Sequence, residues 1–414
     1  MSSSSRRHGR AVRLAAAAVA AAACATGAGA AEVYYQPVIA LSTAYNSNID
    51  LDPLHRQSAE GYFADVATSI GIATPQSDTT LQPRLLYNYY PSASQRNRLE
   101  GFLNLSHRYS WQRDRFSLAG FFDHRDDVNA EQPGAATNPV NPGLGDTPGT
   151  TGQIRVGTTR NYTILDPTYT HLLSPLSAIG IAAEYQRMDY SPSDTSGHLN
   201  FNYYSGRLFY SKTLDLRTDI AVGAYGSRYQ AEAIDSHSTS AGLQFNGGYN
   251  WTEVLRSDLT VQWQRTKFQE NRAQTDLFID ETSNPWAATF STVYKEQISS
   301  YRFSIGRTIY PSSAGSLYTT DQVRGQYDRE LSQRLHFMGA VRVFRDRQTT
   351  GVTHGTNTRN YATGTVKLEY MLTQRIFVAG NYTYVYQKYH LDPTSAQANV
   401  VSLSFGYRGL GPKR

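Results

Sequence analysis

The sequence has almost no cysteine, because Cys24 is the only one among its 414 residues. No disulfide can form within the chain, and no cluster of thiolates can hold a metal ion. No apolar run reaches the length of about eighteen residues that a transmembrane helix needs, and the mean hydropathy is −0.49. A linker, a shift in composition and a block of like charge are also missing. These absences exclude a disulfide scaffold and a helical membrane protein, and they favour one domain.

The N-terminus has the three parts of a secretory signal peptide. Four arginines between positions 6 and 13 form a basic region, residues 14–23 are apolar, and Ala28-Gly29-Ala30 offers small residues for cleavage. A twin-arginine signal at Arg6-Arg7 lacks the expected apolar pair, and a lipoprotein signal at Cys24 lacks a bulky aliphatic residue before it. We predict a signal peptide over residues 1–30 and one mature domain over residues 31–414.

Removal of the signal peptide lowers the net charge of the chain. The formal charge of the whole chain is +5, and four arginines lie in the predicted signal, so the mature chain carries 5 − 4 = +1. The high isoelectric point is therefore no sign of a nucleic-acid partner, and we predict none.

What the sequence does have is alternation, most clearly over residues 360–389. Every second residue from Ala362 to Leu372 is apolar or small, a turn follows at Thr373-Gln374, and the alternation resumes from Ile376 to Tyr386. A period of two indicates strands, because successive side chains leave opposite faces of a sheet. One face is apolar and ends in tyrosines, and the other is mostly polar. This hairpin is typical of a barrel wall between lipid and water.

The same pattern predicts strands along the mature chain, at about residues 33–45, 62–74, 81–89, 99–106, 116–122, 156–172, 177–190, 199–212, 217–230, 237–251, 255–268, 303–311, 317–329, 335–343, 360–372, 376–386 and 401–407. Residues 127–154 and 269–285 are predicted loops, because they are polar and without periodicity. If the short turns all lie at one rim, an even number of strands must separate any two of them. Between the turns at Thr252 and Ser332 this rule requires a further strand near residues 287–296. We therefore predict an all-β transmembrane antiparallel barrel of about 18 strands, or 16 if that segment is irregular.

A soluble sheet protein would also show alternation. It explains less well the signal peptide, the long strands, and a second face that is rich in Asn, Ser, Thr and Gln rather than Lys and Glu. The 30 tyrosines, against 16 phenylalanines, suit rings with one apolar and one wet side at a membrane interface. Membrane lipid is therefore a predicted partner, with the outer membrane of a Gram-negative bacterium as the location.

Four short motifs follow one another along the predicted strands. They are Tyr45-Asn46-Ser47-Asn48, Pro311-Ser312-Ser313-Ala314-Gly315, Leu331-Ser332-Gln333-Arg334-Leu335 and Leu372-Thr373-Gln374-Arg375. In the order of these motifs the chain resembles a family of beta-barrel porins found in many Gram-negative exopolysaccharide operons. The resemblance implies a stand-alone barrel of about eighteen strands that lets a polysaccharide cross the outer membrane, with a periplasmic polysaccharide export protein as a partner. One departure is that the chain continues past Tyr407 to Arg414.

Catalysis and metal binding find little support in the sequence. The ten histidines lie singly, as at His107, His171 and His336, and no pair has ligand spacing on one strand face. No serine, histidine and acidic residue converge in the pattern. We predict no enzymatic activity, no cofactor and no metal, and the resemblance supplies no catalytic residues.

The face opposite the lipid carries charges of both signs, which can pair with one another or set the preference of a pore for charged solutes. The candidate pore-lining residues are Arg84, Glu100, Arg108, Asp123, Arg125, Glu184, Arg207, Asp219, Arg256, Asp258, Arg302, Arg324, Asp328, Arg342, Lys367 and Glu369.

Three functions remain open from the sequence: polysaccharide export, general diffusion of small solutes, and a structural or adhesive barrel. The loop over residues 127–154 bears on this choice, because loops of this length are usually functional or disordered. It either stays outside or folds into the barrel mouth, where Asp126-Asp127 at its base would meet arginines of the wall.

Overall fold

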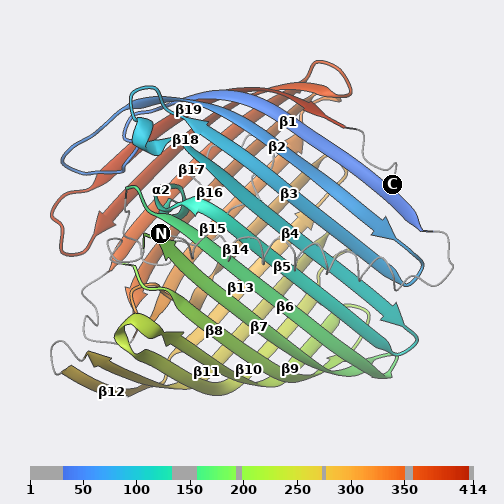
Figure 1. The fold of residues 1–414 in the computed structure, drawn as a ribbon. Coiled ribbons are helices and arrows are strands. Elements are labelled where there is room, and N and C mark those ends of the chain that lie inside the picture. The colour runs from blue at the N-terminus through green and yellow to red at the C-terminus, as the bar shows by residue number, and fades with distance from the viewer. Residues whose placement is uncertain (1–30, 133–155, 193–197, 273–276, 350–357, 410–414) are drawn as a thin grey trace, which may run out of the picture.

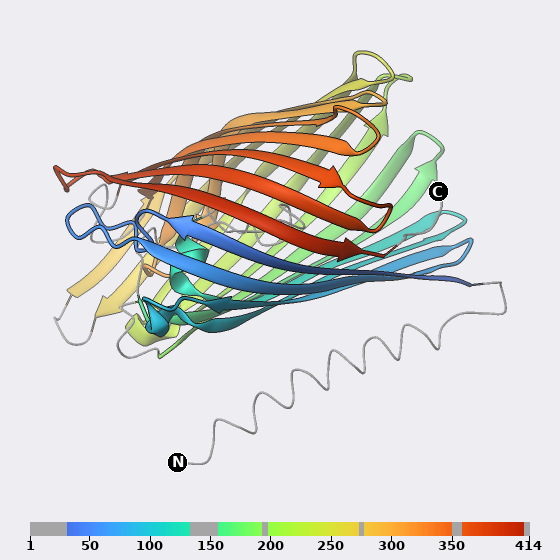
Figure 2. The ribbon, with the colours of Figure 1, turned by 90° about the horizontal axis from the view of Figure 1, so that it is seen from above.

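The computed structural model describes residues 31–132, 156–192, 198–272, 277–349 and 358–409. The predicted signal peptide and most of the loop over residues 127–154 lie outside these residues. The described part is nearly all sheet, wound into one barrel (Figures 1 and 2). The strands are β1 (Glu32–Asn46), β2 (Ala59–Ala73), β3 (Ser77–Tyr89), β4 (Arg98–Trp111), β5 (Asp114–Asp126), β6 (Thr159–Ser174), β7 (Ser177–Ser191), β8 (Phe201–Thr213), β9 (Thr218–Ala231), β10 (Ser236–Asn250), β11 (Leu255–Arg272), β12 (Leu277–Ser283), β13 (Trp286–Lys295), β14 (Ser299–Pro311), β15 (Leu317–Glu330), β16 (Leu335–Gln348), β17 (Arg359–Met371), β18 (Ile376–Tyr389) and β19 (Ala396–Arg408). The short helices are η1 (Ser94–Arg96), α2 (Asp127–Glu131) and η2 (Glu232–Ile234).

The barrel is closed by its first and last strands. β1 pairs antiparallel with β19 from Val38↔Arg408 to Asn46↔Val400, and it pairs with β2 on its other side. Every other neighbouring pair is antiparallel as well. Closure leaves no strand edge that would expose unpaired backbone groups to lipid.

β12 and β13 act as one wall strand. β11 pairs with β12 through Thr266–Arg272 and with β13 through Leu255–Trp263. The break falls at Asn284-Pro285, where proline has no N–H to donate to a ladder. Counted this way the nineteen strands form eighteen wall strands. The prediction of 18 strands is confirmed, and the strand predicted near residues 287–296 is β13.

The predicted loop over residues 269–285 is wrong. β11 continues to Arg272, and β12 returns beside it. β12 makes no ladder with β14, so this hairpin extends beyond the wall that β13 and β14 share. A hairpin with water on both faces has no reason to alternate, and the sequence pattern could not reveal it.

The two rims of the barrel differ in their connections. At one rim, here called the turn end, strands are joined by short turns such as residues 112–113 and 331–334, and Glu32 and Arg408 lie there too. At the other, the loop end, most connections are longer, such as residues 47–58 and 90–97, although residues 232–235 between β9 and β10 form a short one. The predicted division between short turns and long loops is confirmed.

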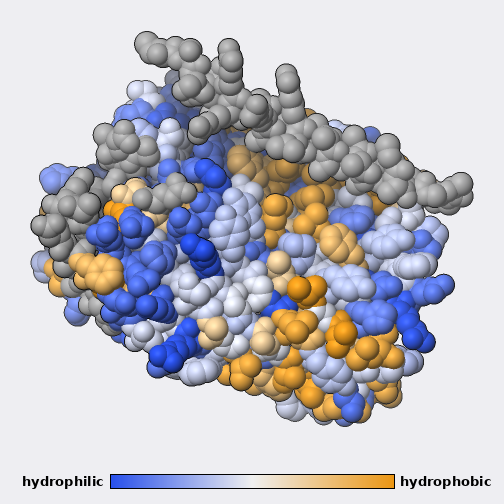
Figure 3. Space-filling model, turned by 60° about the horizontal axis from the view of Figure 1, so that its bottom comes forward, coloured by the Kyte–Doolittle hydropathy of each residue, from blue (hydrophilic) through white to orange (hydrophobic). Residues whose placement is uncertain are grey.

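The outer face is an apolar belt. In β19 burial alternates strictly, with Val401, Leu403 and Phe405 more than half exposed. A strand of fourteen residues measures about 46 Å and, tilted by about 45°, spans about 33 Å, close to the hydrocarbon thickness of a bilayer. Figure 3 shows apolar side chains gathered over the middle and right of the wall and hydrophilic ones at the left end.

Aromatic side chains lie at both edges of this belt. Near the turn end Tyr301 stacks on Tyr327 at 4.5 Å between ring centroids, and Tyr249 meets Trp251 edge-on at 4.8 Å. Near the loop end Tyr185 lies 5.2 Å from Tyr204. Rings with one apolar and one polar side are stable at the membrane–water interface.

Candidate functional site

The inner face of the barrel is the candidate site. All the predicted pore-lining residues occupy inward positions, because each alternates along its strand with side chains that point outward. Their surroundings differ with height in the barrel. Toward the loop end most of them are buried, and toward the turn end most are solvated, except for the buried Lys367 and Glu369.

Buried ion pairs fix the wall toward the loop end. Arg84 on β3 binds Asp65 on β2 through two hydrogen bonds of 2.8 Å, and both side chains are almost fully buried. Arg160 on β6 donates to Asp123 on β5 at 2.9 Å, and neither side chain is exposed at all. Both pairs join neighbouring strands, and buried charges are tolerated only when they are paired in this way.

Phe102 on β4 lies between two guanidinium groups of the inner face. The Arg84 and Arg125 guanidinium carbons are 5.1 and 5.7 Å from its ring centroid. Both arginines and the ring are buried, so cation–π attraction acts here away from bulk water. This ring fills space beside the charges and is not open to the lumen.

Helix α2 turns into the lumen directly after β5. Asp126 is its N-cap, and the Asp126 carboxylate accepts from the Val128 N–H at 2.9 Å. Asp127, Val128, Ala130 and Glu131 are all buried. A helix of this length has little stability of its own, so contacts with the wall must hold it in place.

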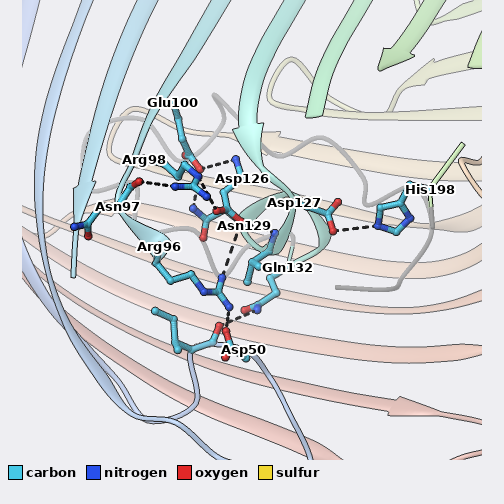
Figure 4. A network of polar contacts seen from close by, with 12 residues as sticks. Asp50, Arg96, Asn97, Arg98, Glu100, Asp126, Asp127, Asn129, Gln132 and His198 are labelled. Carbon is cyan, nitrogen blue, oxygen red and sulfur yellow. Dashed lines mark hydrogen bonds and ion pairs between the residues drawn. The ribbon is translucent and has the colours of Figure 1, made fainter. Parts of the chain in front are cut away.

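The first contacts of α2 are with β4 and the segment before it (Figure 4). Glu100 accepts hydrogen bonds from the Asp126 N–H at 3.1 Å and from the Asn129 amide at 2.7 Å. Arg96 in η1 pairs with Asp50 in the first loop and lies 4.0 Å from Asp126, whereas Arg98 is 3.8 Å from Asp126. The expectation that the acidic base of this loop meets arginines of the wall is confirmed for Asp126.

Other contacts carry α2 across the barrel. Glu131 lies 3.7 Å from Arg359 on β17, and six wall strands separate β17 from β5 on the shorter way round. The Gln132 amide donates to the Ile49 carbonyl at 3.3 Å. His198 Nε2 lies 3.1 Å from an oxygen of Asp127, with both side chains buried. Helix α2 therefore joins four separate parts of the rim.

A second segment folds inward at the tip of the β14–β15 hairpin. β14 pairs with β13 only up to Ala288↔Arg307, but with β15 to Pro311↔Leu317. Beyond this point Leu317 of β15 joins a largely aromatic cluster from β6–β9, and Ile309 packs against it. The buried members of that cluster are Tyr162, Met188, Tyr190, Phe201, Tyr203, Tyr229, Ala231 and Leu317.

Hydrogen bonds hold this tip, residues 312–316, against the wall. The Tyr229 hydroxyl donates to the Ser312 carbonyl at 2.7 Å, Ser313 donates to the Tyr190 hydroxyl at 3.0 Å, and Ser236 donates to the Gly315 carbonyl at 2.7 Å. Gly315 has a φ of +86°, which glycine adopts without strain. Together α2 and the tip narrow the loop end of the lumen.

The charges toward the turn end are paired more loosely. Arg256 lies 2.9 Å from Asp219 and 2.8 Å from Asp258, and all three side chains are more than two-fifths exposed. Arg302 is 3.9 Å from Asp328. Glu369 pairs at 2.9 Å with Lys367 and with Arg408, and here only Arg408 is substantially exposed. The Arg256 and Arg302 pairs place both signs of charge along a wet wall, whereas Lys367 and Glu369 are buried.

The remaining candidates have varied surroundings. Arg207 lies over Phe209 at 4.9 Å and Arg342 over Phe344 at 5.2 Å. Glu184 accepts from Gln186 on its own strand. Arg324 is half-buried on β15, and Arg108 is exposed on β4.

Several residues of the mouth lie outside the predicted set. Asp50, Arg96, Glu131, His198 and Arg359 all hold the inward-folded segments in place. All but Arg359 lie outside the wall strands, where alternation gives no signal. Burial lowers the pKa of Arg96, and Asp126 and Asp127 oppose that effect.

No group of three or more potential metal ligands occurs among the described residues. Within the same ranges, no helix is long and apolar enough to cross a membrane.

Among solved structures the chain is similar to proteins of two bacteria. Acinetobacter baumannii OccAB3 has a TM-score of 0.44 and 10% identity, over 91% of this chain and 99% of that chain. Pseudomonas aeruginosa OccK2 (OpdF), in complex with glucuronate, has a TM-score of 0.44 and 11% identity, over 92% and 99%. Pseudomonas aeruginosa OpdK with vanillate has a TM-score of 0.42 and 12% identity, over 91% and 99%. No family model and no curated protein matches the chain. The closure and strand count of the barrel rest on its own strand pairings.

Proposed function

We propose that this protein is an outer-membrane channel for the passage of small polar solutes. The closed ladder, the apolar belt and the aromatic edges support a location in a membrane. The short turns and both ends of the barrel chain would face the periplasm. No catalytic role is part of the proposal, and membrane lipid is the partner that the apolar outer face supports.

The observation that carries this proposal is the narrowing of the loop end. Helix α2 reaches Arg359 across the lumen, and the β14–β15 tip reaches Tyr190 and Tyr229. A barrel of this strand number would otherwise enclose an open aqueous channel. A small solute needs only a narrow polar path, whereas a hydrated polymer needs these buried contacts to separate. Diffusion of small solutes therefore fits better than polysaccharide export, which the resemblance implies.

The inward charges would act as the wall of that path. Arg256, Asp258 and Asp219 lie toward the turn end, where a solute past the mouth would meet them. Charged side chains along a pore set its preference among solutes. The buried pairs toward the loop end, such as Asp123 with Arg160, would instead hold the mouth.

The test is permeation through the purified protein in liposomes. Swelling rates are measured for arabinose, raffinose and a dextran, with protein-free liposomes as the control. We expect arabinose to enter readily, raffinose slowly and dextran not at all. Entry of dextran would support export of polymers, and no entry of any solute would leave a structural barrel.

Unheated protein should also migrate faster than heated protein in a detergent gel, and a protein that is soluble without detergent would contradict the membrane location.

A further inference from the structure

A recess opens in the inner wall across β3–β6, on the turn-end side of the Asp65–Arg84 pair. It has a volume of about 490 Å³. Its floor is made of small side chains, because Ser106 on β4 and Ala119 on β5 are register partners. Larger side chains surround them, with Phe121 and Ile164 on one side and Arg108 on the other. The recess therefore follows from small residues placed between large ones.

The charges in this recess differ from those of the surrounding wall. Asp78, Arg108 and Asp166 line it, and none of the three makes a hydrogen bond or ion pair with any described part of the chain. Arg256 and Lys367 elsewhere in the turn half both have carboxylate partners within 3 Å. The recess carries a formal charge of +1 − 2 = −1. These charges are available to a ligand.

A buried donor also lies at the recess. The side-chain nitrogen of Asn104 is buried and has no hydrogen-bond partner among the described residues. An unsatisfied buried donor costs free energy, which an acceptor on a ligand would recover. Phe121 and Ile164 supply an apolar surface nearby. The recess thus offers a cationic donor, a neutral donor, carboxylate acceptors and an apolar wall.

We propose that this recess binds a small zwitterion with an apolar side chain, as a neutral α-amino acid has. The Arg108 guanidinium and the Asn104 amide donate hydrogen bonds to the carboxylate of the solute. The Asp166 carboxylate accepts hydrogen bonds from the ammonium group of the solute, and the apolar side chain of the solute packs on Phe121 and Ile164. The negative net charge disfavours a solute that is only an anion. This inference rests on the proposed function, because the solute must reach the lumen.

The experiment measures how solutes block the ion current of the full-length protein in planar bilayers. The probes are leucine, its cationic analogue leucinamide and its anionic analogue 4-methylpentanoate. The readout is the concentration that halves the current. We expect leucine to block at a concentration about tenfold below that of either analogue, the factor for one lost charge-assisted hydrogen bond.

Two variants assign the charges. Asp166→Asn should remove the advantage of leucine over 4-methylpentanoate, and Arg108→Gln should remove its advantage over leucinamide. Both side chains are unpaired and at least partly accessible, so the barrel should assemble, which heat-modifiable migration checks. Asp215→Asn removes a carboxylate at the turn between β8 and β9, away from the recess, and should change nothing.

The outcomes separate this inference from the proposed function. If the channel conducts but all three probes block equally, or the two variants keep the preference, the recess is not a zwitterion site and the small-solute channel stands. If leucinamide blocks as well as leucine, Arg108 binds no carboxylate and the inference is overturned. If arabinose does not enter liposomes and no current flows, the proposed function fails, and this inference fails with it.

Discussion

The two halves of the lumen differ in the state of their charged side chains. Toward the loop end Asp123, Arg160 and Glu131 are fully buried and held by wall strands or inward-folded segments. Toward the turn end Arg256 and its two partners are more than two-fifths exposed. The same alternation of sequence gives both sets, so the difference comes from the segments that cover one set. We infer that the first set stabilises the mouth and the second meets solutes.

The largest expected difference between the two halves is in the loss of the free energy of unfolding when a charge pair is broken. Asp123→Ala removes the carboxylate that accepts a hydrogen bond from the fully buried Arg160, and removing one member of a buried pair costs about 3–5 kcal/mol. Asp258→Ala in the turn half breaks a solvated pair, which is worth less than about 1 kcal/mol. The free energy of unfolding is measured for both variants by urea titration of the protein in detergent micelles. Equal losses would show that the two halves do not differ in this way.

The next effect is on the mouth. The double variant Asp127→Ala/Glu131→Ala removes the side-chain contacts of α2 with His198 and Arg359. The contacts of Glu100 with Asn129 and of Arg359 with the Glu131 carbonyl remain, but a helix this short has little stability of its own and is weakened in its place. We expect single-channel conductance to rise severalfold, and cells to become more sensitive to large antibiotics, while heat-modifiable migration shows an assembled barrel.

The matching control for α2 lies in the turn half. Lys367→Gln removes one contact of Glu369 and leaves Arg408 in place. Its effect on conductance should be small. If the α2 variant conducts like the unmodified protein, the narrowing of the loop end does not limit the current.

The β14–β15 tip gives a smaller effect with a close control. In Gly315→Ala the new methyl carbon would lie 2.7 Å from Ile234 and 3.0 Å from Leu199, at a φ of +86°. Gly157 has a φ of +85°, and no atom of the described residues lies within 4 Å of such a carbon. Both substitutions incur the backbone strain of about 1–3 kcal/mol, but only the first displaces the tip. We expect higher conductance for Gly315→Ala alone, and equal conductance of the two variants would contradict it.

Much of the barrel could be predicted from the sequence, because lipid on one side and water on the other impose alternation. That rule placed Lys367 on the inner face of the barrel and Leu368 on the outer face. The requirement for an even number of strands between turns at the same rim predicted β13. It failed for residues 269–285, where β12 has water on both faces. It could not find the contact of Glu131 with Arg359, because the path of a loop across a lumen leaves no periodic trace. The contact of Asp126 with arginines could be predicted only because two adjacent acidic residues at the end of a strand favour cationic neighbours.

The last and smallest effect concerns the wet half alone. Asp258→Asn removes one of the two carboxylates beside Arg256 and leaves Asp219 at 2.9 Å. The lumen gains one positive charge, so anions should be favoured. For a solvated charge worth about 0.5 kcal/mol the permeability ratio of chloride to potassium should rise about twofold in 0.1 M salt. Reversal potentials across a KCl gradient measure that ratio. In 1 M salt the Debye length falls to about 3 Å, and the change should vanish. A change that persists in 1 M salt would show that Arg256 acts in a site shielded from water, and the contrast between the two halves would then be wrong for this part of the wall.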